Sequence, residues 1–400
     1  MLTIKLITIV VIIVLLFILK KELWLFMLFA SLILSILSGV TPQKFFIGVL
    51  HALSDISTIR IVASIYLIIT LGTVLATTGY FKKLINSLGR LLPDLRFSIV
   101  IPPALLGLLP MPAGAMMSAP MVKETGKKFD LSPEDMTFFN YWFRHIWEYS
   151  WPLYPGLILA ATLVDLPITT LAIRQSPMIV LAASLGLLFL CARIAQPEIK
   201  PLSISPGAFL EFFTSIWPIL SIIILVIVLK INLVAALISV LILCFAIHKM
   251  RFRMILKSLK DGFAPKTLLL IVSVMVFKKI LEISGIVTLV PQILMRYSVP
   301  VTVPLFLSAF FAGFVTGINS AFVGISFPIF LSVLKSDIDL TFFAYISGFA
   351  GVLLSPVHLC LVVTKEYYKA NLAKVYIRLL PVVILLLSFG IFIAYVRGIK

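Results

Sequence analysis

Residues 137–156 read TFFNYWFRHIWEYSWPLYPG, an apolar and aromatic run that is interrupted near its end by Pro152 and, three residues later, by a second proline. Proline inside a helix removes a backbone hydrogen bond, so the run predicts a helix that breaks near Pro152. The pattern returns 204 positions later. Residues 341–345 read TFFAY, against TFFNY in residues 137–141, and Pro356 lies 204 positions after Pro152. Two matched broken helices are typical of membrane carriers built from two repeated halves.

The composition is that of a polytopic membrane protein. Hydrophobic residues make up 61% of the chain, charged residues only 12%, and the mean hydropathy is +1.17. So few polar side chains cannot cover the surface of a soluble domain, and we predict a multi-pass protein of the inner (cytoplasmic) membrane with the lipid bilayer as a partner. The net charge of +17 fits the lysine and arginine that accumulate in cytoplasmic loops, so no nucleic-acid partner is expected.

Ten apolar stretches approach the length of about 20 residues that a membrane-spanning helix needs. The predicted spans are residues 4–19, 22–40, 59–79, 137–163, 177–193, 208–229, 231–247, 263–283, 341–363 and 377–396. The two spans that contain Pro152 and Pro356 are the broken ones. Segments 80–96, 249–262 and 364–376 mix basic and apolar residues at helical spacing, so we expect helices along the membrane interface, with solvated loops as the alternative.

Two further apolar stretches, 97–122 and 300–332, are each interrupted in the middle by residues that form turns. In the first stretch, residues 108–114 read LLPMPAG and combine two prolines with a glycine. In the second, residues 315–320 read VTGINS, where the glycine permits a turn and Asn or Ser can cap the next helix. Both stretches are predicted to be re-entrant hairpins, the alternative being a kink in a full span.

Each half of the chain would then hold five spans, one of them broken, and one hairpin. An odd number of crossings turns the second half upside down relative to the first, so the predicted fold class is an all-α inverted repeat. We place the first repeat at residues 1–193, a Pro- and Ser-rich linker at 194–207 and the second repeat at 208–400. The distribution of Lys and Arg among the loops favours both chain ends outside the cytoplasm.

Two motifs, LPMPAGAMMSAP at residues 109–120 and NYWFRHIWEYSWPLYPG at residues 140–156, resemble an uncharacterised prokaryotic integral-membrane family of the ion-transporter superfamily. That superfamily also includes gluconate permeases, sodium/dicarboxylate symporters and arsenite permeases, and the resemblance covers essentially the whole chain. It implies a homodimer formed by a scaffold domain, and a transport domain of hairpins and broken helices that moves like an elevator. In the carboxylate carriers of that group, Ser, Asn and Thr side chains at the hairpin tips hold the substrate.

The second hairpin tip is similar to that pattern because it carries Asn319 and Ser320, whereas the first tip has no polar side chain. The second arms would start at Gly114 and Ser320, and a helix N-terminus attracts anions through its free amide groups. We therefore predict a site for a small organic anion, such as a carboxylate or sugar acid, where both tips meet both breaks. Close helix packing is the alternative role of the small residues. The predicted substrate-binding residues are Pro112, Ala113, Gly114, Tyr154, Thr316, Gly317, Asn319, Ser320, Ser355, Pro356 and His358.

Ionisable side chains within a bilayer are costly and mark functional sites. Arg144 and Glu148 stand four residues apart on one helical face with His145 beside them, and we assign all three to an ion pair or to coupling-ion handling. The alternatives are a purely structural pair, anion binding by Arg144 and proton handling by Glu148. His358 falls at the second break, 204 positions after Tyr154 at the first, where a histidine can hold an anion, exchange protons or simply pack.

These patterns favour a secondary active transporter coupled to Na⁺ or H⁺, with an ion channel of the same fold as one alternative. The other alternative is an intramembrane hydrolase with a metal held by His145, Glu148 and His358, but the chain has no H-E-x-x-H, G-x-S-x-G or P-loop motif. We therefore expect no enzymatic activity, no cofactor and no bound metal. The three cysteines all lie in apolar runs and are expected to pack there, not to form disulfides.

Overall fold

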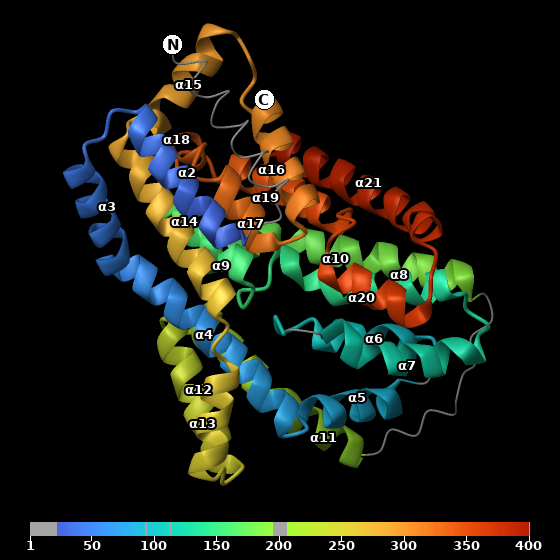
Figure 1. Cartoon of the computed structure of the whole chain (residues 1–400). Helices are drawn as coiled ribbons and strands as arrows, with labels where there is room; N and C mark the ends of the chain where they lie inside the picture. The colour runs from blue at the N-terminus through green and yellow to red at the C-terminus, as the bar shows by residue number, and fades with distance from the viewer. Residues whose placement is uncertain (1–21, 93, 112–113, 195–205, 400) are drawn as a thin grey trace.

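The computed structural model describes residues 22–92, 94–111, 114–194 and 206–399, and within these ranges the chain is helical with no β-strand (Figure 1). The helices of the N-terminal half are α2 (Leu23–Leu37), α3 (Pro42–Ser54), α4 (Ile56–Thr77), α5 (Tyr80–Leu91), α6 (Phe97–Leu106), α7 (Gly114–Lys128), α8 (Pro133–His145), the 3₁₀ helix η1 (Ile146–Tyr149), α9 (Pro155–Val164) and α10 (Ile168–Arg193). The helices of the C-terminal half are α11 (Pro206–Ile223), the π-helix η2 (Ile224–Val228), α12 (Leu233–Ile247), α13 (Phe252–Asp261), α14 (Pro265–Ile283), α15 (Ile286–Arg296), α16 (Thr302–Thr316), α17 (Asn319–Ser326), α18 (Leu331–Leu334), α19 (Ile338–Leu353), α20 (Leu359–Tyr368) and α21 (Leu372–Val396).

The protein is a helical membrane protein. Helices long and apolar enough to cross a membrane are, among the described residues, Ile56–Thr77, Ile168–Arg193, Gly207–Val228 and Leu372–Val396. Many large apolar side chains lie exposed on the helix surfaces, as expected where helices face lipid. The described helices cover the predicted spans from 22–40 onward, whereas span 4–19 and nearly all of the predicted linker lie outside the described residues.

Both predicted helix breaks are confirmed. α8 ends at His145, continues as η1 and then leaves helical geometry, and α9 starts at Pro155. Proline suits this first position because its missing N–H would have no intrahelical partner there. At the second break α19 ends at Leu353 and α20 starts at Leu359, with Pro356 in the gap. The backbone therefore lacks helical hydrogen bonds at two points within the bundle.

Both interrupted apolar stretches form helix–turn–helix units. α6 lies beside α7 and α16 beside α17, so each segment folds back on itself and is not one kinked helix (Figure 1). The second turn depends on Gly317, whose φ of +63° lies in the left-handed region that favours glycine. A Cβ atom there would also approach the His358 Cα atom to 2.8 Å. In the first turn, Pro112 and Ala113 lie outside the described residues.

Helices form in two of the three segments where connecting helices were predicted between the apolar ones. Residues 80–96 and 249–262 contain the amphipathic helices α5 and α13. Residues 364–376 do not form one connecting helix, because the chain reverses at Lys369, in the left-handed region, and Asn371 caps the start of α21. That prediction was wrong because the basic residues belong to the ends of two apolar helices. The short helices α3 and α15 were not predicted.

Two aspartates at helix starts tie the long helices α21 and α10 to the broken helices. Asp135, in the first turn of α8, lies 2.6 Å from Arg378 of α21, and Asp339, in the first turn of α19, pairs with Arg174 of α10. Burial alone would raise the pKa of the Asp135 carboxyl, but hydrogen bonds from Arg378 and Ser132 outweigh this effect and hold that pKa below its usual value. The carboxylate is therefore ionised at neutral pH and keeps these bonds.

Replacing Asp135 by Asn is expected to destabilise the protein, because the largely buried Arg378 then loses its carboxylate partner. A hydrogen bond between charged groups contributes about 1.5–3 kcal/mol, and its loss should lower the melting temperature in detergent micelles. Asp339→Asn should act in the same way through Arg174. Asp261→Asn, at the exposed end of α13, is the matched control, and an equal effect there would show that the ion pairs do not stabilise the fold.

Candidate functional site

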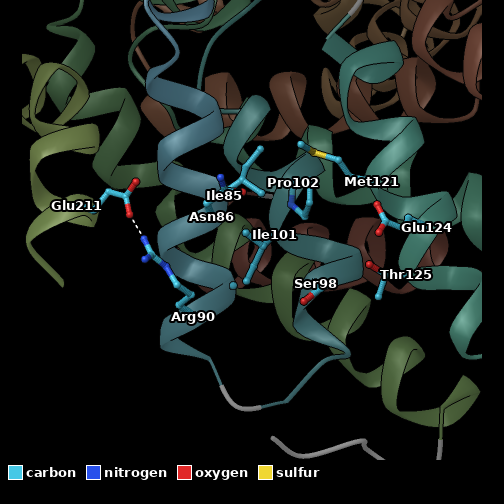
Figure 2. Close-up of a pocket in the computed structure, with 11 residues that line it drawn as sticks. Ile85, Asn86, Arg90, Ser98, Ile101, Pro102, Met121, Glu124, Thr125 and Glu211 are labelled. Atoms are coloured by element: carbon cyan, nitrogen blue, oxygen red, sulfur yellow. Dashed lines mark ion pairs between the residues drawn. The ribbon is translucent and has the colours of Figure 1, made fainter. Parts of the chain in front are cut away.

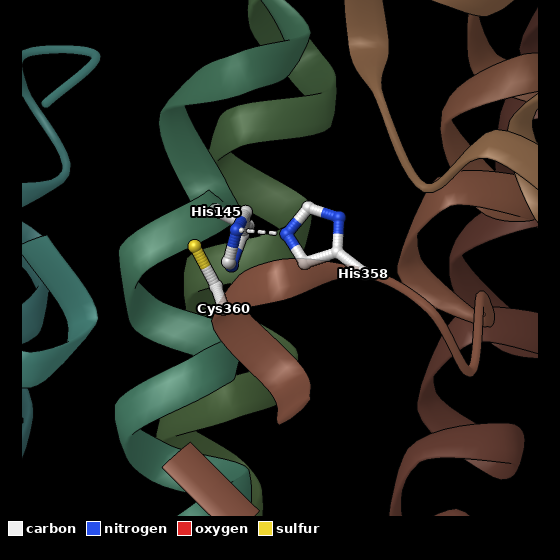
Figure 3. A group of neighbouring side chains, drawn as sticks. All are labelled: His145, His358 and Cys360. Atoms are coloured by element: carbon white, nitrogen blue, oxygen red, sulfur yellow. Dashed lines mark hydrogen bonds between the residues drawn. The ribbon is translucent and has the colours of Figure 1, made fainter. Parts of the chain in front are cut away.

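The two helix breaks meet at a pair of buried histidines (Figure 3). His145 is the last residue of α8, and His358 directly precedes α20. Their Nε2 atoms lie 3.0 Å apart, although 213 positions separate the two residues in the sequence. The fold thus brings one predicted coupling residue into contact with one predicted substrate-binding residue.

The other ring nitrogen of each histidine faces a backbone carbonyl. The His145 Nδ1 atom lies 2.6 Å from the carbonyl oxygen of Tyr141, and the His358 Nδ1 atom lies 2.6 Å from that of Gly317. A carbonyl oxygen only accepts hydrogen bonds, so we assign the N–H of each ring to Nδ1. The two Nε2 atoms are left to face each other.

Glu148 joins the histidine pair to the tip of the second hairpin. Its Oε1 atom lies 3.7 Å from His145 Nε2, and its Oε2 atom accepts a hydrogen bond of 3.1 Å from Asn319 Nδ2. Glu148 reaches this position because the chain tightens into the 3₁₀ helix η1 after His145, which aligns residues three apart on one face. The carbonyl of Glu148 accepts a further hydrogen bond from the Tyr345 hydroxyl of α19 at 2.9 Å.

Arg144 is buried against the first hairpin. Its Nη1 atom donates to the carbonyl of Leu106 at 2.7 Å, and its Nη2 atom donates to the carbonyl of Met111 at 3.1 Å. The predicted ion pair between Arg144 and Glu148 is absent from the described part of the chain, because the 3₁₀ turn re-aims Glu148 and the last carbonyls of α6 attract the guanidinium. The Nε atom of Arg144 has no hydrogen-bond partner among the described residues.

Two glycines let the first hairpin approach the first broken helix closely. A Cβ atom on Gly114, the first residue of α7, would lie 2.7 Å from the Arg144 guanidinium. A Cβ atom on Gly107, at the end of α6, would lie 2.4 Å from the Arg144 carbonyl oxygen. Tyr154, at the first break, donates from its hydroxyl to the Gly107 carbonyl at 2.5 Å. The predicted residues Gly114 and Tyr154 therefore both contact this hairpin or the arginine that holds it.

Ser355 and Asn319 bring unpaired polar atoms to the second break. Ser355 is fully buried next to Gly317, and within the described ranges its Oγ atom forms no hydrogen bond. The Oδ1 atom of Asn319 also lacks a partner in the described structure and lies against Gly156 in the first turn of α9. Buried polar atoms are normally hydrogen-bonded, so these atoms are suited to contact a polar ligand.

The remaining predicted substrate-binding residues bring fewer free polar groups to this centre. Thr316 donates to the carbonyl of Ala312 within its own helix at 2.6 Å, and Pro356 is exposed. Ser320 is buried in the first turn of α17, behind the tip formed by Gly317 and Asn319. The structure thus concentrates the polar contacts on a subset of the predicted residues.

Three residues of this centre were not predicted. Cys360, half-buried at the start of α20, offers a sulfur atom, and one ligand atom from each of His145, His358 and Cys360 lies within 4.8 Å of the other two. Its position two residues after His358 could have indicated a place in this centre, but its apolar neighbours in the sequence favoured a packing role. Tyr141 and Tyr345, which close the repeated TFF-x-Y motif, donate to backbone carbonyls at the break in the opposite half.

An open cleft of about 670 Å³ lies between α5, α6, α7 and α11 (Figure 2). Its lining includes Asn86, Ser98 and Glu124, and an ion pair between Arg90 and Glu211 borders it. Its lining contains none of the predicted site residues. The chemistry of the chain is concentrated at the helix breaks instead.

Nearly the whole chain matches one protein family. The model of a family described as Protein of unknown function (DUF401) matches residues 2–397. The chain belongs to this family. The DUF401 match includes His145, Glu148 and His358 and the tip of the second hairpin. No curated protein matches the chain. The DUF401 family carries no assigned activity, so function is inferred from the chemistry of the centre.

A methyl group added at Gly156 is expected to displace the second hairpin tip. Its Cβ atom would lie 2.4 Å from Asn319 Oδ1, so Gly156→Ala must push this side chain away from Glu148. We expect about 1–3 kcal/mol of destabilisation from the overpacking and faster hydrogen exchange in α17. Gly89→Ala is the control, because nothing lies within 4 Å of that helical position, and it should be neutral or stabilising. Equal effects of the two substitutions would refute the contact.

Proposed function

We propose that the protein is a secondary active transporter of the inner (cytoplasmic) membrane that moves a small organic anion, such as a carboxylate or sugar acid, with Na⁺ or H⁺ as the coupling ion. The observation that carries this proposal is the polar centre where both helix breaks and the tip of the second hairpin converge. Carriers bind their substrates at such breaks, where backbone groups and half-helix ends are free of intrahelical bonds. Ionisable groups are costly in a bilayer, which also favours a functional role for this centre.

We include in the proposal that the chain is an inverted repeat with the boundaries predicted from the sequence. The helix starts support it, because α9 and α20 begin at Pro155 and Leu359, 204 positions apart. α10 and α21 begin at Ile168 and Leu372 with the same offset. In each pair, one helix follows the first break and the other follows the second, so the offset found in the sequence motif extends to whole helices.

Reciprocal contacts between the halves support a two-fold relation. Tyr141 donates to the carbonyl of Leu353 at the second break at 3.0 Å. Tyr345, 204 positions after Tyr141, donates to the carbonyl of Glu148 at the first break at 2.9 Å. A bond from the first half to the second thus has a counterpart from the second half to the first. Such reciprocity is the property of an interface with a two-fold axis, and a translated copy would not produce it.

The ion pairs repeat the same reciprocity. Asp135 of the first half pairs with Arg378 of the second, and Asp339 of the second half pairs with Arg174 of the first. Both aspartates and both arginines are 204 positions apart in the sequence. These contacts and the odd number of predicted spans in each half together favour a two-fold axis in the membrane plane.

An anionic substrate is supported by two features. The Arg144 guanidinium lies next to Gly114 at the N-terminus of α7, and its Nε atom has no partner within the described residues, so a positive group and helix amides are available together. A second cleft, of about 990 Å³, has a positively charged lining. Its charged residues are Arg60, Lys230, Lys278, Lys335, Asp55 and Asp165. An excess of positive charge in a cleft raises the local concentration of anions.

The mechanism proposed is that of an elevator-type homodimer. It is supported by the resemblance of residues 109–120 and 140–156 to the ion-transporter superfamily, where a transport domain of hairpins and broken helices moves against a scaffold. His145, His358 and Glu148 can exchange protons, whereas backbone carbonyls and the Ser355 hydroxyl are the oxygen ligands that suit Na⁺. Saturable exchange of substrate across liposomes would separate this carrier from a channel.

Ser355→Ala tests the substrate site. The Ser355 Oγ atom bonds to no described residue, so its removal should leave the melting temperature of the ligand-free protein unchanged. Binding of the anion should weaken about 10- to 150-fold, because a hydrogen bond to a charged ligand contributes about 1.5–3 kcal/mol. A thermal-shift screen of carboxylates and sugar acids, with and without Na⁺, first identifies the anion to be titrated.

Ser215→Ala in α11 is the matched control. Ser215 is also a buried serine whose Oγ atom lacks a partner in the described structure, but it lies outside the centre. Its replacement should leave the affinity unchanged. Unchanged affinity in Ser355→Ala as well would place the binding site elsewhere.

The inverted repeat predicts that Lys127 and Lys335, at the ends of corresponding hairpins, lie on opposite sides of the membrane. A cysteine introduced at each position, in a background without the three native cysteines, should react with a membrane-impermeant maleimide from opposite faces of oriented vesicles. Labelling of both positions from the same face would contradict the inverted repeat, and it would leave the outcome of the Ser355 experiment unaffected.

A further inference from the structure

We propose that His145, His358 and Cys360, with Glu148 as a fourth ligand, form a binding site for a divalent transition-metal ion of the Zn²⁺ type. One ligand atom from each of His145, His358 and Cys360 lies within 4.8 Å of the other two. Figure 3 shows these side chains together where the end of α8 meets the start of α20. Imidazole nitrogen and thiolate sulfur are ligands that Zn²⁺ prefers, whereas Na⁺, Mg²⁺ and Ca²⁺ prefer oxygen.

The hydrogen bonds on the far side of each ring point to a cation between the rings. Both Nδ1 atoms donate to backbone carbonyls, those of Tyr141 and Gly317, so both Nε2 atoms carry lone pairs when the rings are neutral. Two lone pairs 3.0 Å apart repel each other, and a positive charge between them removes the repulsion. Two nitrogens about 2.0 Å from a tetrahedral ion lie about 3.3 Å apart. A small movement of the rings is therefore enough to admit the ion.

The surroundings already orient the ligands as metal sites require. A histidine that binds a metal almost always donates its other ring nitrogen to a carbonyl, carboxylate or water, which fixes the direction of the ring. Both histidines do so here. The Glu148 Oε1 atom lies 3.7 Å from His145 Nε2, and Asn319 holds the other carboxylate oxygen at 3.1 Å. A shift of this carboxylate toward a bound ion would complete a tetrahedral set of two nitrogens, one sulfur and one oxygen.

A proton shared between the two Nε2 atoms is the competing occupant. It would also remove the repulsion of the lone pairs, because one ring would become a donor to the other. The Glu148 carboxylate, 3.7 Å from His145 Nε2, would pair with the resulting imidazolium, but the proton itself would use only the two ring nitrogens and not the sulfur of Cys360. A third donor atom, the sulfur of Cys360, lies within 4.8 Å of one nitrogen of each ring, and this grouping of two nitrogens with a sulfur favours the metal ion. The expectation of no bound metal, made from the sequence, did not include Cys360 in the centre.

A bound ion would connect the two halves of the chain. His145 and Glu148 belong to the first break, whereas His358 and Cys360 belong to the second. Through the Asn319 bond to Glu148, the ion would also restrain the tip of the second hairpin. An ion that binds only the folded protein raises its melting temperature. The site does not require that the protein transport an anion.

Titration with Co²⁺ tests the site in the full-length protein, purified in detergent and stripped of metal with a chelator. Tetrahedral Co²⁺ bound through a thiolate gives a sulfur-to-metal charge-transfer band in the near ultraviolet and intense bands in the visible range. We expect saturation at one ion per chain, displacement by Zn²⁺ and loss of the charge-transfer band in Cys360→Ser. His358→Ala should weaken binding by at least about tenfold, as loss of a ligand or its orienting partner does in metal sites.

Cys244→Ser and His248→Ala are the matched controls, because they remove the same side-chain types from α12 and its C-terminal end. Both should bind Co²⁺ as the unmodified protein does. Absence of Co²⁺ binding, or an unchanged charge-transfer band in Cys360→Ser, would overturn the proposal. A nitrogen NMR spectrum with one proton between the His145 and His358 rings, and no bound ion, would assign the centre to a proton. Cys360→Ser changes a single atom, so it preserves the test where a histidine variant fails to fold.

Discussion

The structure depends on one constraint, that backbone groups released by breaking a helix within a bilayer must find partners inside the protein. Water is not available there, and an unpaired peptide group costs on the order of several kcal/mol. The chain has two helix breaks and two hairpin turns, and side chains from elsewhere in the sequence reach each of them. The donors and the carbonyls that they bind are Arg144 to Leu106 and Met111, Tyr154 to Gly107, His358 to Gly317, Tyr141 to Leu353, and Tyr345 to Glu148.

This constraint explains the composition of residues 137–156. Tyrosine and tryptophan bring a single donor on a large apolar body, so they can satisfy a carbonyl without leaving a charge in lipid. Trp147 donates to the carbonyl of Ala104 at 2.7 Å, and Trp142 donates to that of Ala182 at 2.9 Å. The segment that breaks therefore also carries donors that hold the neighbouring helices and the first hairpin in place.

Some polar atoms of the same centre have no hydrogen-bond partner in the described structure, and these atoms could bind a ligand. Arg144 Nε, Asn319 Oδ1 and Ser355 Oγ have no partner within the described ranges, whereas the donor atoms of the proposed metal site are different ones. Asn319 connects the two sets, because its Nδ2 atom donates to the proposed ligand Glu148 while its Oδ1 atom is unpaired in the described structure. A centre with every polar atom paired would gain little from binding, so unpaired atoms at a point where two halves meet are a reason for a ligand to bind there.

By itself the sequence determined the membrane class, the positions of both breaks and the folding back of both hairpins. These features follow from local chemistry, namely hydropathy over about 20 residues, the missing N–H of proline and the left-handed φ open to glycine. Only the tertiary structure decided which polar groups meet. His145 and His358 are 213 positions apart, and Cys360 reads as a packing residue until its neighbours are known. The predicted pairing of Arg144 with Glu148 was wrong because it assumed a continuous α-helix. The chain instead tightens into a 3₁₀ helix after His145, and Arg144 donates to a carbonyl 38 positions away. Both features depend on contacts that are distant in the sequence.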